Sequence, residues 1–137
     1  VLRAACGPFH SLFLVQDEGT GRPVLLSCGQ NDAGQLGVGS QLSMPEYREP
    51  TDVPGLEAED IQNVLCGWDF SLLHLRDGNV LAFGCNWYGQ LGLGPDVFGP
   101  SRISTTPQPM LGLGVGAGKR KARSISCGYT HTVVAYE

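Results

Sequence analysis

The chain has 137 residues, of which 42% are hydrophobic and 16% are charged, and its formal net charge is −4. This length supports one modest hydrophobic core, so we expect a single unit over 1–137 rather than several independent domains. There is no apolar run of about 18 residues that could cross a bilayer, and the first ten residues do not resemble a secretory signal. Twenty glycines and nine prolines alternate with short β-prone runs, which predicts an all-β fold with many turns.

Long stretches of the sequence recur. CGPFHSLFLVQD at 6–17 matches CGWDFSLLHLRD at 66–77, and CGYTHTVVAYE begins a further copy at the end of the chain. These matches divide the chain into repeat one (6–65), repeat two (66–126) and the start of repeat three (127–137).

Each repeat has the pattern of short strands joined by turns. In repeat two, residues 71–76 and 80–83 are β-prone runs joined by Asp77-Gly78, where glycine permits the positive φ of a tight hairpin. The segments PTDV (50–53) and IQNVL (61–65) are two further candidate strands. Four strands in about 60 residues correspond to one propeller blade, which must pack against neighbours because a single blade cannot bury both of its faces.

Two glycine-rich strings raise the question of a nucleotide site. GQNDAGQLGVG (29–39) and GCNWYGQLGLG (84–94) have enough glycine for a phosphate loop, but Gln35 and Leu36 stand where such a loop needs Lys and Ser or Thr. No helix pattern follows to present its amino terminus to a pyrophosphate. The strings therefore predict structural turns without a cofactor, and the turn residues are Asn31, Gly34, Gly37, Asn86, Gly89 and Gly92.

The residue types of catalytic and metal sites also occur, but not in suitable patterns. His10 and His131 share one repeat position, which favours a structural role over general acid or base catalysis. The five cysteines are too far apart for C-x-x-C pairs, and three of them precede glycine at one repeat position, which indicates buried free thiols. We predict no catalytic residue and no metal ligand, and a reducing compartment, either cytoplasm or nucleus.

The order of these motifs resembles the repeat of the regulator of chromosome condensation family. The similar elements are CG-x-x-[HF]-[ST], DG, N-x-x-GQLG-x-G and a final CG. The resemblance implies a seven-bladed β-propeller, of which this chain would hold about two blades and one strand of a third. Such a partial propeller is expected to need its missing blades or to self-associate. The string CGWDF resembles a stretch of the secretion-regulating guanine nucleotide exchange factor-like member of the family.

Positions that differ between the repeats are candidates for partner binding. Trp87-Tyr88 replaces Asp32-Ala33 inside the glycine-rich string, either as an interface or as packing against the adjacent blade. Trp68 and Asp69 follow the repeated CG.

The segment GKRKAR (118–123) contributes Lys119, Arg120 and Lys121, either as a solvated loop tip or as a contact for an acidic partner. One short basic patch on an acidic chain does not favour general nucleic-acid binding.

Two functions remain. The first is a non-enzymatic module that binds a protein partner through its variable loops. The alternative, implied by the resemblance, is guanine nucleotide exchange on a small GTPase.

Overall fold

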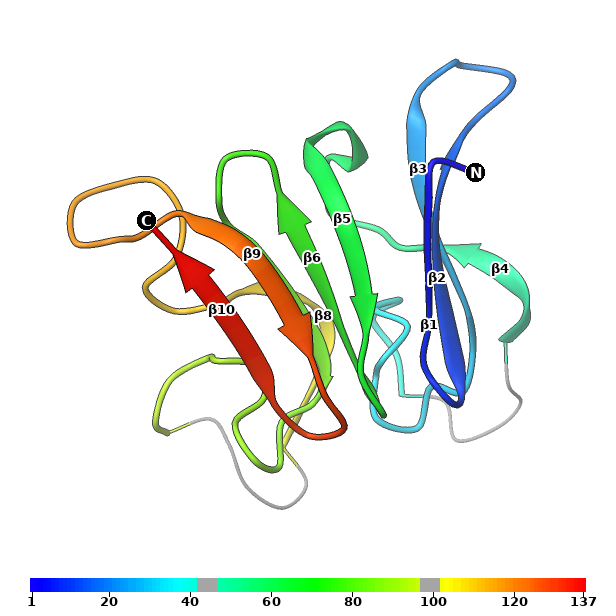
Figure 1. The fold of residues 1–137 in the computed structure, drawn as a ribbon. Coiled ribbons are helices and arrows are strands. Elements are labelled where there is room, and N and C mark those ends of the chain that lie inside the picture. Colours follow the sequence, from blue (N-terminus) through cyan, green and yellow to red (C-terminus); the bar gives the residue numbers. More distant parts are fainter. Residues whose placement is uncertain (42–46, 97–101) are drawn as a thin grey trace.

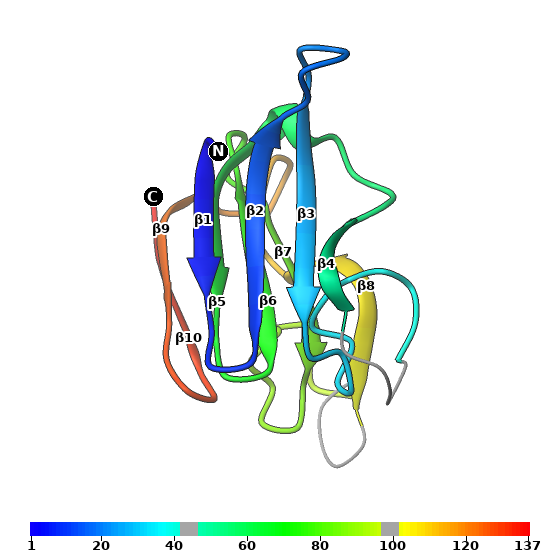
Figure 2. The ribbon, with the colours of Figure 1, turned by 90° about the vertical axis from the view of Figure 1, so that its right-hand side faces the viewer.

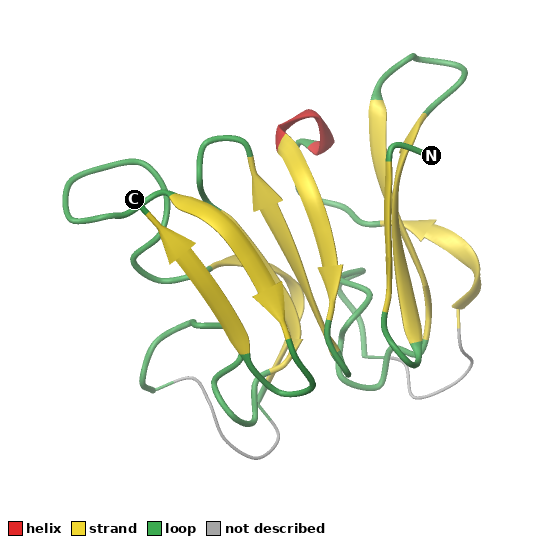
Figure 3. Ribbon diagram, viewed as in Figure 1, coloured by secondary structure: helices red, strands yellow, loops and turns green. Residues whose placement is uncertain are grey.

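Three antiparallel sheets follow one another along the chain in a computed structural model, which describes residues 1–41, 47–96 and 102–137 (Figure 1). The first sheet has the order β1-β2-β3-β4 and the second β5-β6-β7-β8, while the third pairs β9 with β10. Their bounds are β1 Arg3–Cys6, β2 His10–Gln16, β3 Pro23–Gly29, β4 Tyr47–Asp52, β5 Ile61–Cys66, β6 Phe70–Leu75, β7 Val80–Cys85, β8 Ile103–Pro109, β9 Ala122–Cys127 and β10 Thr132–Tyr136. A short 3-10 helix, η1 (Ala58–Asp60), precedes β5, and strands form almost all the remaining regular structure (Figure 3).

The three sheets have equivalent strand pairings. Cys6 pairs with Ser11, Cys66 with Ser71 and Cys127 with Thr132, so the first two strands of each sheet meet in one register. β5 contacts both β1 and β9, which places the first strands of the sheets side by side. Figure 2 shows these strands along one side of the molecule and β4 and β8 along the other. The sheets are therefore successive blades of a partial propeller.

The middle blade is buried on both faces. Side chains alternate across a strand, so neighbouring residues of β6 point to opposite sides of the sheet. Leu73 packs in a cluster between the first and second blades, with Leu12, Leu25 and Phe83. Leu72 packs in a second cluster between the second and third blades, with Phe70, Val80, Leu91 and Ala122. Because its neighbours cover both faces, β6 is buried at every position from Phe70 to His74 rather than at alternate ones.

The strands predicted from the sequence are present. β6 and β7 cover the predicted runs 71–76 and 80–83 to within two residues at each end, and Gly78 between them has a φ of 89°. β4 includes most of PTDV, and β5 contains IQNVL. The single strand expected in repeat three is β10, and it pairs with β9, which ends at Cys127. No helix in the described ranges is long and apolar enough to cross a membrane.

The connections between strands lie at two opposite faces of the blades, because each strand reverses the direction of the one before it. One face, here called the glycine-loop face, carries the turns at 7–9, 67–69 and 128–131 and the loops at 30–41 and 86–96. The other, here called the basic-loop face, carries the connections at 17–22, 53–60, 76–79 and 110–121. In Figure 1 the glycine-loop face is at the bottom and the basic-loop face at the top.

Candidate partner-binding surface

The two glycine-rich loops share one hydrogen-bonded frame. The side-chain oxygen of Asn31 accepts a hydrogen bond of 3.1 Å from the Leu36 backbone, and the Asn86 side chain accepts one of 2.9 Å from Leu91. Gly34 and Gly89 both have positive φ, 78° and 77°. Their amides donate to the carbonyls of Asn31 and Asn86. Gly37 and Gly92 donate in the same way to Gly34 and Gly89. These backbone donors are used inside the loop, whereas a phosphate cradle would present them to a ligand.

A hydroxyl of the following blade holds each of these loops. Ser71 Oγ donates a hydrogen bond of 2.7 Å to the carbonyl of Gln35, and Thr132 Oγ1 donates one of 2.8 Å to the carbonyl of Gln90. These contacts join residues far apart in sequence, and sequence reasoning did not predict them. The signal that could have found them is the hydroxyl residue that recurs at one position near the start of the second strand of each sheet: Ser11, Ser71 and Thr132.

His10 also contacts Ser71, the hydroxyl that donates to the Gln35 carbonyl. Its Nε2 lies 2.9 Å from Ser71 Oγ. Because the Ser71 proton is directed to Gln35, we assign the Nε2 proton as the donor to Ser71, which leaves Nδ1 unprotonated. Nδ1 makes no hydrogen bond to any described residue. Burial lowers the pKa of His10 to about 4, and the backbone of Phe70 opposes this shift in part. His10 thus joins two blades as a neutral imidazole.

Trp87 and Tyr88 lie on the loop of the second blade and remain largely accessible, with 49% and 72% of their surfaces exposed. They change the polar contacts of this loop relative to the first blade. There, Gln35 Nε2 donates a 3.2 Å hydrogen bond to the Asp32 carboxylate. In the second blade Trp87 supplies no such acceptor, and the Nε2 of the buried Gln90 makes no hydrogen bond to a described residue. The Cys85 thiol interacts with Gln90, but sulfur is a weak acceptor.

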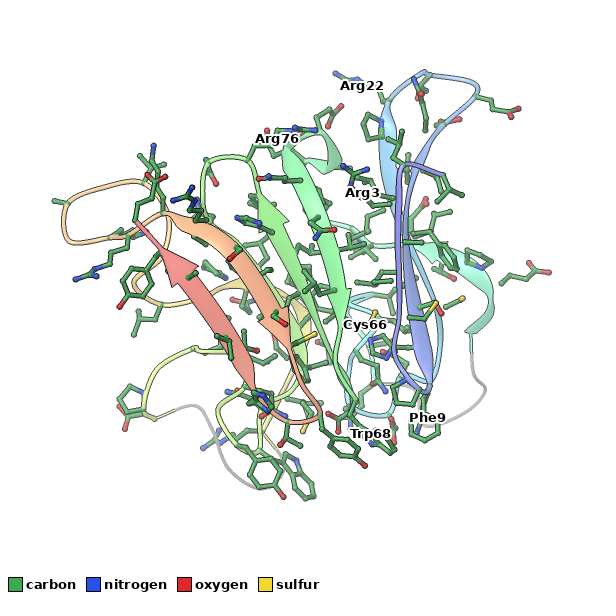
Figure 4. The ribbon with its side chains drawn as sticks, in the orientation of Figure 1. Arg3, Phe9, Arg22, Cys66, Trp68 and Arg76 are labelled. Carbon is green, nitrogen blue, oxygen red and sulfur yellow. The ribbon has the colours of Figure 1, made fainter. Side chains whose placement is uncertain are left out.

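Trp68 is the centre of a row of three aromatic rings, one from each blade. Its ring stacks on Tyr129 with centroids 3.9 Å apart, and Phe9 meets it edge-on at 5.0 Å. Figure 4 shows Phe9 and Trp68 together at the glycine-loop face.

Asp69, the residue after Trp68, is partly buried, and its Oδ1 has no hydrogen-bond partner in the described part of the chain. Burial raises the pKa of the Asp69 carboxyl. The charge of Asp32 adds to this rise, and a hydrogen bond with the Cys85 thiol reduces it.

The basic residues lie on the opposite face. Lys119, Arg120 and Lys121 are exposed in the connection from β8 to β9, which is closed by a 3.0 Å hydrogen bond from Arg120 N to Gly112 O. The Arg120 guanidinium lies over the Tyr136 ring, 4.5 Å from its centroid. The structure therefore brings Trp87, Tyr88, Trp68 and Asp69 to one face and separates them from the three basic residues.

The cysteines are free thiols, and Cys6, Cys66 and Cys127 occupy equivalent positions at the ends of β1, β5 and β9. The expected burial was wrong for Cys6, which is exposed, while Cys66 and Cys127 are half-buried. Burial is the main cause that raises the pKa of Cys66 to about 12, and the neighbouring Cys127 and Cys6 add to it. A thiol that stays protonated is a poor nucleophile. No group of three or more His, Cys, Asp or Glu among the described residues could hold a metal ion.

A family model described as the regulator of chromosome condensation (RCC1) repeat matches residues 24–73 and 77–135. The chain belongs to the RCC1 repeat family. It is 36% identical over 135 residues to the secretion-regulating guanine nucleotide exchange factor of Bos taurus, a match that covers 98% of this chain and 25% of that protein. It is also 36% identical over 134 residues to the Homo sapiens probable E3 ubiquitin-protein ligase HERC6, covering 97% of this chain and 11% of the ligase.

Among solved structures, human WBSCR16 aligns with a TM-score of 0.73 and 28% identity, covering 98% of this chain and 30% of that one. The chain thus spans a quarter or less of the two curated relatives. These matches confirm the RCC1-repeat assignment, the partial propeller and the similarity to the secretion-regulating exchange factor.

Proposed function

We propose that this RCC1-repeat chain is a non-enzymatic interaction module that binds a protein partner through its glycine-loop face. The observation that carries the proposal is the exposure of Trp87 and Tyr88, at 49% and 72%. Large aromatic side chains that pack against a neighbouring blade would be buried, whereas exposed ones on a loop are typical of interface anchors.

The polar contacts of the same loop support this assignment. In the first-blade loop Gln35 donates to the Asp32 carboxylate, while the second-blade loop carries Trp87 in that place and offers Gln90 Nε2 only the weak Cys85 acceptor among the described residues. Unsatisfied buried donors are rare in folded proteins and concentrate where function competes with stability. Trp87 stands where the otherwise equivalent first-blade loop has Asp32. This difference therefore favours a role for Trp87 in partner recognition over a role in folding.

The proposal is tested by substitution in the full-length protein. We expect Trp87→Ala to weaken the affinity for a partner recovered with the wild-type protein by about thirtyfold, since loss of an aromatic anchor costs about 2 kcal/mol of binding. Lys121→Ala, which removes one exposed charge on the basic-loop face, should change the affinity less. Val115→Ala is the control, because Val115 is an exposed apolar residue in the connection that carries the basic residues. Equal affinities for Trp87→Ala and Val115→Ala would refute the assignment.

Guanine nucleotide exchange on a small GTPase is the second candidate. It is favoured by the 36% identity to a protein named as a guanine nucleotide exchange factor. The relationship to a ubiquitin ligase over the same residues supports the interaction module instead, because one propeller segment then occurs in proteins of different activity. Nucleotide release from a panel of small GTPases, measured with the full-length protein, separates the candidates. The free thiols fit a cytoplasmic or nuclear location for either one.

A further inference from the structure

A hollow on the glycine-loop face lies between the loops of the first two blades. It has a volume of about 440 Å³, and its lining includes Asp32, Gln41, Asp69, Cys85, Trp87 and Ile103. Two of these side chains are carboxylates and one is an exposed indole. Within the described ranges no lysine or arginine lines the hollow.

The carboxylates of this hollow have unused hydrogen-bonding capacity. Asp69 Oδ1 is buried and makes no hydrogen bond to a described residue. Asp32 Oδ1 accepts a single bond from Gln35. A buried carboxylate oxygen without a donor is costly, so a ligand that brings N–H groups and positive charge would stabilise it. Burial raises the pKa of Asp69, the Cys85 thiol opposes this rise and the charge of Asp32 adds to it, so a cation in the hollow would favour the ionised carboxylate.

Beside the two carboxylates, the hollow is lined by the aromatic side chain of Trp87. Trp87 is 49% exposed, so part of its ring system is open to a ligand. An indole face attracts cations, and a planar guanidinium can stack on it while donating to carboxylates at its edge. Arg102 precedes Ile103 in the chain, but it forms no ion pair with either aspartate in the described structure. Among the described residues the hollow thus combines negative charge, an acceptor without a donor and an aromatic wall, and its lining contains no positive charge.

We propose that this hollow binds an arginine side chain of the protein partner. The guanidinium donates hydrogen bonds to Asp69 and Asp32, and its planar face lies against Trp87. This inference rests on the proposed function, because it names the group through which a partner would be anchored on the glycine-loop face.

The test uses the full-length protein with ¹⁵N-labelled tryptophan and the peptide acetyl-Gly-Arg-Gly-amide as the probe. The Trp87 indole resonance is assigned by its loss in Trp87→Phe. We expect the arginine peptide to shift this resonance saturably, with a dissociation constant on the order of millimolar. The same peptide with citrulline has nearly the same shape but no charge, and it should bind at least tenfold more weakly.

Substitutions measure how much each carboxylate contributes to the affinity for the arginine peptide. Asp69→Asn should weaken the binding of the arginine peptide about tenfold or more, because a charged hydrogen bond is replaced by a neutral one. Asp32→Asn should weaken it less, because Asp32 is exposed. Asp60→Asn, in η1 on the basic-loop face, should leave it unchanged and is the matched control. An unchanged unfolding midpoint in thermal melts shows that each variant retains the fold.

Two results would overturn the inference: citrulline binding as tightly as arginine, or full affinity for arginine in Asp69→Asn. The outcomes also distinguish it from the proposed function. If Trp87→Ala weakens the affinity for the natural partner while Asp69→Asn changes the affinity for neither the partner nor the peptide, the face binds a partner but not through an arginine. If the arginine peptide binds while Trp87→Ala leaves the partner unaffected, the hollow exists but the partner docks elsewhere.

Discussion

Ser71 Oγ donates a 2.7 Å hydrogen bond to the backbone carbonyl of Gln35 across the boundary between the first two blades. Both residues are fully or almost fully buried, and His10 Nε2 lies 2.9 Å from the same oxygen. The hydroxyl accepts from one blade element and donates to another, so it couples the glycine-rich loop of one blade to the second strand of the next. Thr132 and Gln90 repeat the contact at the following boundary.

Ser71→Ala should therefore destabilise the protein. It leaves the Gln35 carbonyl and the His10 Nε2 proton buried without partners, and we expect a loss of about 1–3 kcal/mol in the free energy of unfolding. Ser11→Ala is the matched control, since Ser11 holds the equivalent position in the first blade and its hydroxyl donates to Cys6 Sγ at 3.4 Å rather than to a carbonyl of another blade among the described residues. Denaturant titrations measure the free energy of unfolding of both variants. Equal losses of this free energy in Ser71→Ala and Ser11→Ala would contradict this role for Ser71.

His10 should make stability depend on pH. Its pKa is about 4 in the folded protein and 6.5 ordinarily, so the unfolded chain binds the proton more readily. The stabilisation is complete above pH 6.5 and is lost as the pH falls from 6.5 toward 4, by up to about 3 kcal/mol. Thermal melts between pH 6.5 and 4 should show this loss of stability as a falling unfolding midpoint.

His10→Phe provides the comparison, because Phe70 occupies the same position in the second blade. The difference between wild type and this variant isolates His10 from the other titrating groups. We expect the variant to lose less stability than the wild type as the pH falls below 6.5. A pH profile parallel to that of the wild type would show that His10 does not titrate in this way.

Gly37 should be more sensitive to substitution than Gly55. Its φ is 70°, and a Cβ there would lie 2.8 Å from the Phe83 ring of the second blade. Gly55 has a similar φ of 77° but open space around it. Gly55→Ala should cost about 1 kcal/mol for the backbone conformation alone. Gly37→Ala should cost about 1–3 kcal/mol more from overpacking, and equal unfolding midpoints for the two variants would disprove the contact.

The two tryptophans should differ in what they contribute to folding. Trp68→Ala removes a ring that contacts both Phe9 and Tyr129, and we expect it to lower the free energy of unfolding by about 1–3 kcal/mol. Trp87→Ala removes an exposed ring and should change it by less than about 0.5 kcal/mol. Thermal melts measure both, and a larger loss for Trp87 would assign that residue to blade packing.

Trp87→Asn should stabilise the second-blade loop. Asparagine would place an oxygen where Asp32 accepts from Gln35 in the first blade, and so offers Gln90 Nε2 an acceptor. We expect a gain of about 0.5–1.5 kcal/mol over Trp87→Ala, together with the same loss of partner affinity. Unfolding by denaturant measures the gain, and the absence of any difference between Asn and Ala would show that Gln90 is already satisfied.

Local patterns were sufficient to predict the repeats, the strands around Asp77-Gly78 and the loop residues Asn31 and Asn86. These features depend on neighbours in the chain: the pleat of a strand, the positive φ that glycine permits and the short reach of an asparagine side chain. The same residues led us to expect structural turns in place of a phosphate loop without reference to the fold.

Only the tertiary structure decided which distant residues meet. The contacts of Ser71 with Gln35 and His10, and of Trp68 with Phe9 and Tyr129, depend on the angle and spacing at which blades pack. The alternating direction of the strands set Trp87 and Lys121 on opposite faces, although both lie in glycine-rich connections. Sequence spacing alone does not specify the partners in these contacts, because they arise when two blades bury their apolar faces against each other.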